Sequence, residues 1–496
     1  MAITDLLIYV GHNWAIFTAL LFTAHILHTR YQKGLHKIPG PRLRSISPLP
    51  RIWSVYKGNS HNDDLDLHKK YGKVVRIAPN TISISDTSEI DHIYGITTKF
   101  YKSRFYDPVR FYDDEGLIPD PFVLTNKEMH SRMKRNAANA YSLNALVPLE
   151  PLVDTVIERL IQVLDADYAD KERACNLGQY MHFYAMDTIF AITFGKDLQF
   201  IENGDRESML ANLQSGLRYM AVAGQIPWIH KFLLGNKLTS YLVSGSNSSE
   251  TFIDEMLQLA TTKTAAAIQN LKPLPPNTPH TFLHHLLLNQ KSHPQTLTTR
   301  EITTHTFGNI LAGSDTTSIA LSSILTNLLQ NPHTYKRLCM ELRNPETEKE
   351  LGFPVAFGPA SKLIYLNAVI KEALRIHPSV GLILPRTVPT SGASICDRYH
   401  VPAGTEVGIN PWIVHRDPEI FPDPDTFKPE RWISNTNSNN SSSPSSLEVE
   451  GNGREKRGGK EGKQGLESMN RAVFAFGAGA HTCSGKHVSF LEMVKL

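Results

Sequence analysis

The sequence predicts a mainly α-helical fold (α+β) with a small β-sheet region. Helix-like patterns dominate the chain to about residue 270, and a long helix is expected from about Thr299 to Gln330. A further helix is expected over Lys362–His377, which a proline follows. By contrast, Val74–Ser85 contains two β-rich runs joined by a Pro-Asn turn, which predicts a hairpin. Helices are therefore expected to supply most of the core, with the hairpin in a minor sheet.

The composition is that of a globular protein. The 496 residues are enough for one large domain or two to three ordinary ones. Lys and Arg total 51 against 48 for Asp and Glu, so a net charge of +3 argues against nucleic-acid binding as the main task. The cysteines lie far apart and form no CxxC pair, which excludes a recognisable zinc knuckle or disulfide framework; they are Cys175, Cys339, Cys396 and Cys483.

The N-terminal segment Leu6–Leu27 is largely apolar and is about long enough to cross a hydrocarbon core of roughly 30 Å. Basic residues follow this segment and none precedes it, so the positive-inside rule leaves the body of the chain in the cytosol. We expect a membrane anchor over 1–29, a basic Pro/Gly linker over 30–45 and one domain over 46–496. A signal-peptide core or a buried helix is the alternative for the apolar segment.

One stretch of the expected domain has a composition that cannot bury apolar area. Residues 435–463 are rich in Ser and Asn and then in Gly, Lys and Glu. Such a run predicts a disordered, low-complexity surface insertion without a catalytic role.

Near the C-terminus, a lone cysteine stands among three glycines in the stretch 476–485. Glycines allow tight backbone turns, so several N–H groups can point at the Cys483 sulfur. The dipole of the helix expected to follow also favours negative charge, and we expect the sulfur to be held as a thiolate, a strong metal ligand. Without these neighbours, Cys483 would be interpreted as a buried core thiol.

The spacing Phe-Gly-x-Gly-x-His-x-Cys-x-Gly resembles the haem-thiolate loop of the cytochrome P-450 monooxygenases. The resemblance implies that the chain binds haem b (iron protoporphyrin IX), with Cys483 as the axial ligand of the iron. It also implies cofactor contacts from the other residues of the loop, which are Phe476, Gly477, Gly479, His481 and Gly485. Two positions depart from the family, which most often has Arg at 481 and an apolar residue at 484. Because the charge of His481 depends on pH, we expect weaker or more pH-sensitive haem retention.

Further cofactor contacts are implied outside this loop. Arg386 follows an apolar run and matches a family position that binds a haem propionate. His130 and Lys134 lie one turn apart on a probable helix, where the family has residues that meet the propionates. Lys134 stands where the family has Arg, and without the resemblance this pair would be a solvated basic face.

The middle of the long helix carries the sequence Ala312–Thr317, with a glycine beside several hydroxyls. Glycine inside a helix costs about 1 kcal/mol and hydroxyls compete for helix carbonyls, so we expect the helix to open or bend here. The stretch resembles the family's groove beside the iron, in which Asp315 and Thr316 would be catalytic and deliver protons to oxygen. On its own, the pattern is more typical of an accidental polar patch in a helix.

Glu372 and Arg375 lie three residues apart on one helix face. An exposed pair of this kind is worth only about 0.3–0.5 kcal/mol. In the family, however, this pair is buried with an arginine from a later Pro-Glu-Arg segment, and Arg431 fills that position here. The resemblance therefore implies a structural network of Glu372, Arg375 and Arg431.

Two apolar stretches are candidates for the substrate pocket. The aromatic-rich run 100–122 could line it, and 216–236 could form a lid near the membrane surface. Packing against the core is the alternative for both.

Taken together, the chain is identified as a member of the cytochrome P-450 superfamily of the fungal microsomal type, similar to the pisatin-demethylase-like group. The resemblance implies a monooxygenase that inserts one oxygen atom from O2 into a lipophilic small molecule in fungal secondary metabolism. It also implies a place in the endoplasmic reticulum membrane, NADPH-cytochrome P-450 reductase as electron donor and cytochrome b5 as an optional further donor. The chain carries no dinucleotide-binding fingerprint of its own.

Two alternatives stay open from the sequence. A haem-thiolate isomerase or dehydratase would keep the cofactor without oxygen insertion. Because the family normally continues beyond the position of Leu496, a truncated, weakly haem-binding or non-catalytic product is the other.

Overall fold

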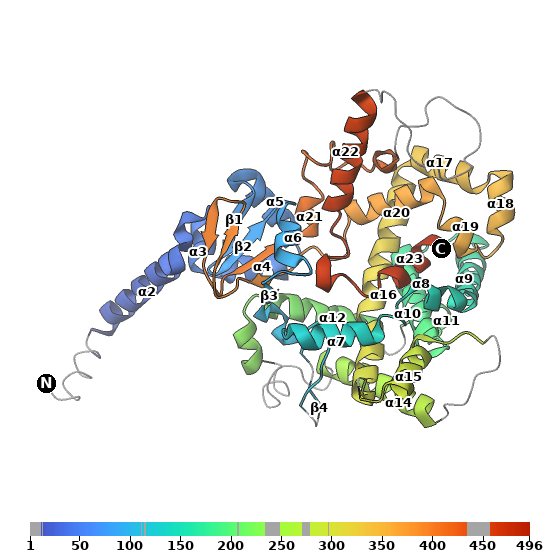
Figure 1. Cartoon of the computed structure of the whole chain (residues 1–496), viewed down its shortest axis with the longest axis horizontal. Helices are drawn as coiled ribbons and strands as arrows, with labels where there is room; N and C mark the ends of the chain where they lie inside the picture. The colour runs from blue at the N-terminus through green and yellow to red at the C-terminus, as the bar shows by residue number, and fades with distance from the viewer. Residues whose placement is uncertain are drawn as a thin grey trace.

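The computed structural model describes residues 11, 13–110, 112–113, 116–205, 208–233, 249–269, 278–295, 297–433 and 457–496. Helices form a broad body, a small sheet lies at one side of it, and helix α2 (Trp14–Tyr31) extends away from that side (Figure 1). The predicted mainly α-helical fold with a small sheet region is confirmed.

The long helix α16 (Thr299–Gln330) runs through the helical body. A capping box fixes its start, because Glu301 N donates to Thr298 Oγ1 over 3.2 Å and Thr298 N donates to Glu301 Oε2 over 3.0 Å. Helices that pack against it include α10 (Leu177–Phe194), α14 (Ser249–Gln269), α15 (Phe282–Ser292), α20 (Ile364–Ile376) and α23 (Lys486–Lys495). Residues 181–193 of α10 are all buried, as expected for a helix that is apolar on every face.

Helix α16 does not open or bend at Ala312–Thr317, so that expectation is wrong. The Ser314 and Thr316 hydroxyls donate to the carbonyls of Ile310 and Ala312, but the helix continues through them. Gly313 has another role there, because a Cβ atom would lie 2.9 Å from Ile189 Cγ1 of α10. The glycine therefore allows the two most extensively packed helices to approach closely.

The main sheet has five strands in the order β1-β2-β9-β6-β3. The predicted hairpin is present as β1 (Val74–Ala78) paired antiparallel with β2 (Thr81–Ile84). β2 pairs in parallel with β9 (Glu406–Ile409), and β6 (Arg386–Thr387) lies antiparallel between β9 and β3 (Tyr101–Lys102). Two further two-stranded sheets pair β4 (Tyr112–Asp113) with β5 (Gly116–Leu117) and β7 (Ala393–Ile395) with β8 (Tyr399–Val401).

Further helices complete the body: α3 (Arg42–Ile46), α4 (Leu49–Tyr56), α5 (Ser60–Tyr71), α6 (Glu89–Tyr94), α7 (Lys127–Ala137), α8 (Leu143–Leu146), α9 (Glu150–Leu164), α11 (Phe200–Asn203), α12 (Met209–Ala223), α15 (Phe282–Ser292), α17 (Pro332–Leu342), α18 (Pro345–Leu351), α19 (Phe357–Ala360), α21 (Pro411–Val414) and α22 (Arg457–Ala472). Short turns of other helix types include η1 (Gln32–Lys37), η2 (Arg104–Val109), η3 (Val147–Leu149), η4 (Asp165–Ala169), η5 (Pro227–Phe232), η6 (Pro429–Trp432) and η8 (Gly479–His481).

Four expected segments fall partly outside the described residues, and two of them are the apolar stretches 100–122 and 216–236, in which residues 111, 114–115 and 234–236 are not described. The proposed span Leu6–Leu27 includes residues 6–10 and 12, which are not described, and no helix in the described part of the chain is both long and apolar enough to cross a bilayer. Of the low-complexity insertion 435–463, residues 435–456 are not described. Its last residues, 457–463, are helical and begin α22, contrary to the expectation of disorder.

Candidate active site

Glycines shape the loop that carries Cys483. Gly477 and Gly479 have φ angles of 69° and 58°, in the left-handed region that favours glycine. A Cβ atom on Gly479 would lie 2.0 Å from the carbonyl oxygen of Tyr94 in α6. The loop is closed by a hydrogen bond of 2.9 Å from Cys483 N to Phe476 O. Both the local conformation and the contact with α6 therefore require glycine at 479.

We predict that Gly479→Ala destabilises the protein more than Gly477→Ala does. Gly477→Ala adds strain in the left-handed region, but its Cβ atom would lie 3.5 Å from His481 O, an ordinary contact. Gly479→Ala adds the same kind of strain and must also move the loop away from Tyr94. Overpacking of this kind costs about 1–3 kcal/mol. Thermal unfolding and haem content of the two variants check this. Equal losses would show that the Tyr94 contact does not shape the loop.

The Cys483 sulfur lies deep among protein atoms, yet its side chain is accessible, so it faces open space and not a packed core. Burial raises the pKa of the thiol, and the backbone N–H groups of Gly485 and Lys486 and the charge of Lys134 oppose that rise. These effects oppose one another, and the thiolate expected from the glycine pattern stays a prediction. A coordinated metal ion deprotonates such a thiol.

Five basic side chains lie near this loop and form what we call the basic cluster: Lys102, His130, Lys134, Arg386 and His481. Strand pairing sets Lys102 opposite Arg386, and the rings of His130 and His481 are 4.2 Å apart between centroids. Lys134 Nζ donates to the carbonyls of Ala480 and Thr482 over 3.0 and 2.7 Å. The sheet and α7 thus bring four of the predicted cofactor contacts together, and they add Lys102.

The basic cluster has no ion pair within the described part of the chain. Burial and mutual repulsion lower the pKa of Lys102 to about 7 and that of His130 to about 4, and they lower the pKa of His481 to about 2. Two buried nitrogens, Arg386 Nε and His481 Nδ1, have no hydrogen-bond partner there. Buried nitrogens without a partner favour an acceptor from outside the chain, and a group with two carboxylates, such as the propionates of haem, fits the basic cluster.

Asp315 and Thr316 lie on α16, where the exposed residues Ala312 and Thr316 mark a stretch of the helix that borders open space. The Asp315 carboxylate is largely buried and lies 3.9 Å from Nε2 of His182 on α10. Burial raises the pKa of Asp315, which the charge of His182 opposes, and burial lowers the pKa of His182. His182 Nε2 has no hydrogen-bond partner among the described residues. The acid is therefore poised to keep a proton, with a histidine as neighbour.

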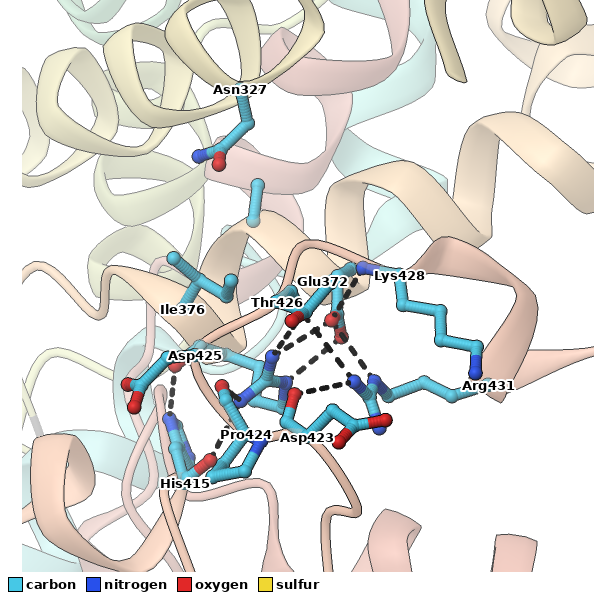
Figure 2. A network of polar contacts seen from close by, with 12 residues as sticks. Asn327, Glu372, Ile376, His415, Asp423, Pro424, Asp425, Thr426, Lys428 and Arg431 are labelled. Atoms are coloured by element: carbon cyan, nitrogen blue, oxygen red, sulfur yellow. Dashed lines mark hydrogen bonds and ion pairs between the residues drawn. The ribbon is translucent and has the colours of Figure 1, made fainter. Parts of the chain in front are cut away.

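In the predicted network, Glu372 and Arg375 are fully buried and the Arg431 side chain is 5% exposed; Figure 2 shows the contacts around Glu372. Arg375 donates to both carboxylate oxygens over 2.9 and 2.8 Å, and Arg431 Nε donates to Oε1 over 3.0 Å. Trp432 Nε1 and the backbone N–H of Lys428 also donate to the carboxylate. The two arginines use their remaining donors on backbone carbonyls, including those of His415, Pro424, Pro422 and Asp423. One carboxylate thus connects α20 with η6.

His415 links this network to the segment that leads into the Cys483 loop. Its Nδ1–H donates to Arg375 O over 3.1 Å, and its Nε2 accepts from Phe474 N over 2.8 Å. Burial lowers the pKa of His415 to about 3, so the ring stays neutral and keeps both bonds.

Sequence reasoning missed three residues with specific contacts here, namely Lys102, His182 and His415. Their neighbours in sequence form no recognisable pattern, and only strand pairing or helix packing brings them to the site. A fourth, Glu492 on α23, is fully buried with both carboxyl oxygens unpartnered within the described chain, and burial raises its pKa far above the usual value.

The sequence model of the family described as Cytochrome P-450 matches residues 41–496. The chain therefore belongs to the cytochrome P-450 family, whose members hold a haem iron, and the geometry of Cys483 and the basic cluster fits that cofactor.

Its relatives are fungal enzymes. It is 33% identical to the cytochrome P-450 monooxygenase cicH of Emericella nidulans over 96% of this chain and 89% of that protein. It is 31% identical to a cytochrome P-450 monooxygenase of Aspergillus terreus over 96% of this chain and 91% of that protein. It is 34% identical to the pisatin demethylase of Fusarium vanettenii over 95% of this chain and 84% of that protein. The predicted haem-thiolate monooxygenase class is confirmed, and such enzymes use O2, a substrate and a redox partner.

Proposed function

We propose that the protein inserts one oxygen atom from O2 into a C–H or C=C bond of a lipophilic small molecule, or dealkylates it oxidatively, in fungal secondary metabolism. The observation that carries this proposal is an accessible cysteine sulfur beside five basic side chains that form no ion pair with other described residues. The related fungal monooxygenases support it. When bound, haem b with a thiolate ligand would supply the oxygen-activating chemistry, because the thiolate pushes electron density toward the iron.

The residues of the chain would divide the remaining work. Cys483 would hold the iron, and the basic cluster would bind the propionates. The Asp315 carboxyl, whose pKa burial raises, would donate a proton through the Thr316 hydroxyl, and the neighbouring His182 would influence the pKa of the acid. Electrons would come from NADPH-cytochrome P-450 reductase, with cytochrome b5 as an optional further donor.

Exposed apolar side chains support a place at the endoplasmic reticulum membrane, with the body on the cytosolic side. On α2 they include Trp14, Leu20, Leu21 and Phe22, and on α4 and η5 they include Trp53, Trp228 and Phe232. Because α4 and η5 both contact α12, these aromatic side chains are placed to guide an apolar substrate from lipid. Cell fractionation of the full chain tests the location.

Membranes that contain the full-length protein test the function. We expect a thiolate-type absorbance band of the reduced, carbon monoxide-bound haem, and product that requires both reductase and O2. Comparing metabolites of strains with and without the protein would identify the substrate. Turnover without O2 or reductase would favour an isomerase or dehydratase and contradict this proposal.

We predict that Asp315→Asn lowers product formation by about 100-fold or more, as expected for loss of a positioned proton donor. Because the raised pKa of Asp315 keeps its proton to higher pH, wild-type activity should fall as the pH rises through that pKa. This fall in activity with rising pH should be absent from the Asp315→Asn variant. Product yield per NADPH, measured across pH, checks both expectations.

His182→Gln is the matched variant. The charge of His182 lowers the pKa of Asp315. Removing the His182 side chain should therefore shift the fall in activity to higher pH. Asp205 is the other charged group that acts on the pKa of His182. The pKa of Asp315 is shifted by burial and by His182. If activity still falls with rising pH in Asp315→Asn, Asp315 is excluded as the origin of that fall.

A further inference from the structure

A cavity of about 230 Å³ lies where α2 and its linker meet the body, away from the loop of Cys483. Its polar lining comes from the end of α2, η1, α3, α5 and β1: Arg30, His36, Arg42, Ser45, Tyr71 and Arg76. No carboxylate belongs to this lining. The cavity therefore concentrates positive charge at the junction between an exposed apolar helix and the protein body.

Backbone contacts hold the walls of the cavity in place. Arg76 N donates to Pro39 O over 2.7 Å, and a Cβ atom on Gly40 would lie 2.4 Å from Arg76 O. The buried guanidinium of Arg76 donates to the carbonyls of Thr29 and Arg30 over 2.8 and 2.7 Å. The linker is thus fixed to β1, and the end of α2 is fixed to the same arginine.

The arginines of the cavity differ from their neighbours in lacking acidic partners. Arg44 and Arg51 lie nearby in sequence, and both pair with Asp64, over 2.8 and 2.9 Å. Within the described chain, Arg30, Arg42 and Arg76 form no ion pair; Arg30 donates only to Ser45 Oγ, over 2.9 Å. Burial and the charge of Arg30 lower the pKa of Arg76 to about 10. An anion from outside the chain would relieve this repulsion.

We propose that this cavity binds a phosphate group, and that the phosphate is the headgroup of an anionic phospholipid. Arginine guanidinium groups present paired N–H donors that match phosphate oxygens. The Tyr71 hydroxyl lies in the same lining and can donate to a further oxygen, whereas Ser45 Oγ already donates to Arg42 O over 2.6 Å. The exposed apolar side chains of α2, which include Leu20, Phe22 and Leu27, lie on the helix that leads into the cavity and favour a lipid over a soluble phosphate. The proposal is independent of the haem site and of the oxygenation reaction.

Calorimetric titration of the full-length holoenzyme in neutral detergent tests this proposal. The probes are dihexanoyl phosphatidic acid below its micelle concentration, dihexanoyl phosphatidylcholine and inorganic phosphate. We expect phosphatidic acid to bind, and the double variant Arg30→Gln/Arg42→Gln to bind it at least about tenfold more weakly, since each arginine near an anionic lipid contributes about 1 kcal/mol. High salt should weaken the binding of the wild type more than that of the variant.

The double variant Arg343→Gln/Lys349→Gln is the control, because it removes the same charge from exposed positions around α17 and α18, at the other side of the molecule (Figure 1). It should bind phosphatidic acid like the wild type. If the first double variant unfolds, Arg42→Gln alone must still lose affinity severalfold, since the Arg42 side chain is exposed and forms no hydrogen bond or ion pair in the described structure.

The outcomes separate the two sources of phosphate. Binding of phosphatidic acid but not of inorganic phosphate supports the lipid headgroup, whereas equal binding of both, lost in the arginine variant, supports a phosphate site filled by a soluble ligand. Equal binding of phosphatidylcholine and phosphatidic acid, no binding at all, or an equal loss in the control variant would overturn the proposal.

Discussion

Replacement of Glu372 by Ala should lower the free energy of unfolding by about 3–5 kcal/mol, the cost of leaving buried charges unpaired. Arg375 and Arg431 would lose their only ionic partner, and the Trp432 N–H its only acceptor, in the described part of the chain. The carbonyls around the two guanidinium groups cannot neutralise them. Denaturant unfolding of the holoprotein measures the loss, and haem content should fall with it, because His415 links the network to the Cys483 loop.

Glu430→Ala is the matched control, since it removes an acid from the same short segment. Glu430 pairs with Arg337 over 2.9 Å, but both side chains are more than a third exposed. Such a pair contributes about 1 kcal/mol or less. If Glu372→Ala were no more destabilising than Glu430→Ala, the buried network would not hold the two segments together.

Cys483→Ser should abolish the thiolate-type absorbance band of the reduced, carbon monoxide-bound protein. Product formation should fall by more than about 100-fold, the upper range for loss of a supporting residue outside the coordination sphere. The reason is that a serine hydroxyl replaces the accessible sulfur that faces open space. Spectra and haem content of membranes with the variant chain measure both effects.

Cys339→Ser, on α17, is the control, because this half-buried thiol lies on a helix remote from the loop in sequence and in the fold. It should leave the band unchanged. A thiolate-type band that survives in Cys483→Ser would show that another residue binds the iron.

The predictions that succeeded depended on short-range patterns. The hairpin β1–β2, helix α16 and the pair Glu372 and Arg375 are each encoded within a few turns of chain, so periodicity and turn chemistry reveal them. The resemblance of motifs then placed Arg431 in the same network from a distant segment.

The failures arose where tertiary contacts decide the outcome. Gly313 signals a helix break when read alone, but its missing side chain makes room for Ile189 of another helix. Lys102 and His182 reach the site through strand pairing and helix packing, which no local pattern reports.

The contact between Gly479 and Tyr94 also bears on the order of events during biogenesis. The two residues come from opposite ends of the chain, and their backbones approach too closely for any side chain at 479. The loop around Cys483 therefore cannot take its final shape while the C-terminal part of the chain is still on the ribosome. Closing so long a loop costs conformational entropy that other contacts have to offset, so we expect the Cys483 loop to take its final shape late in folding.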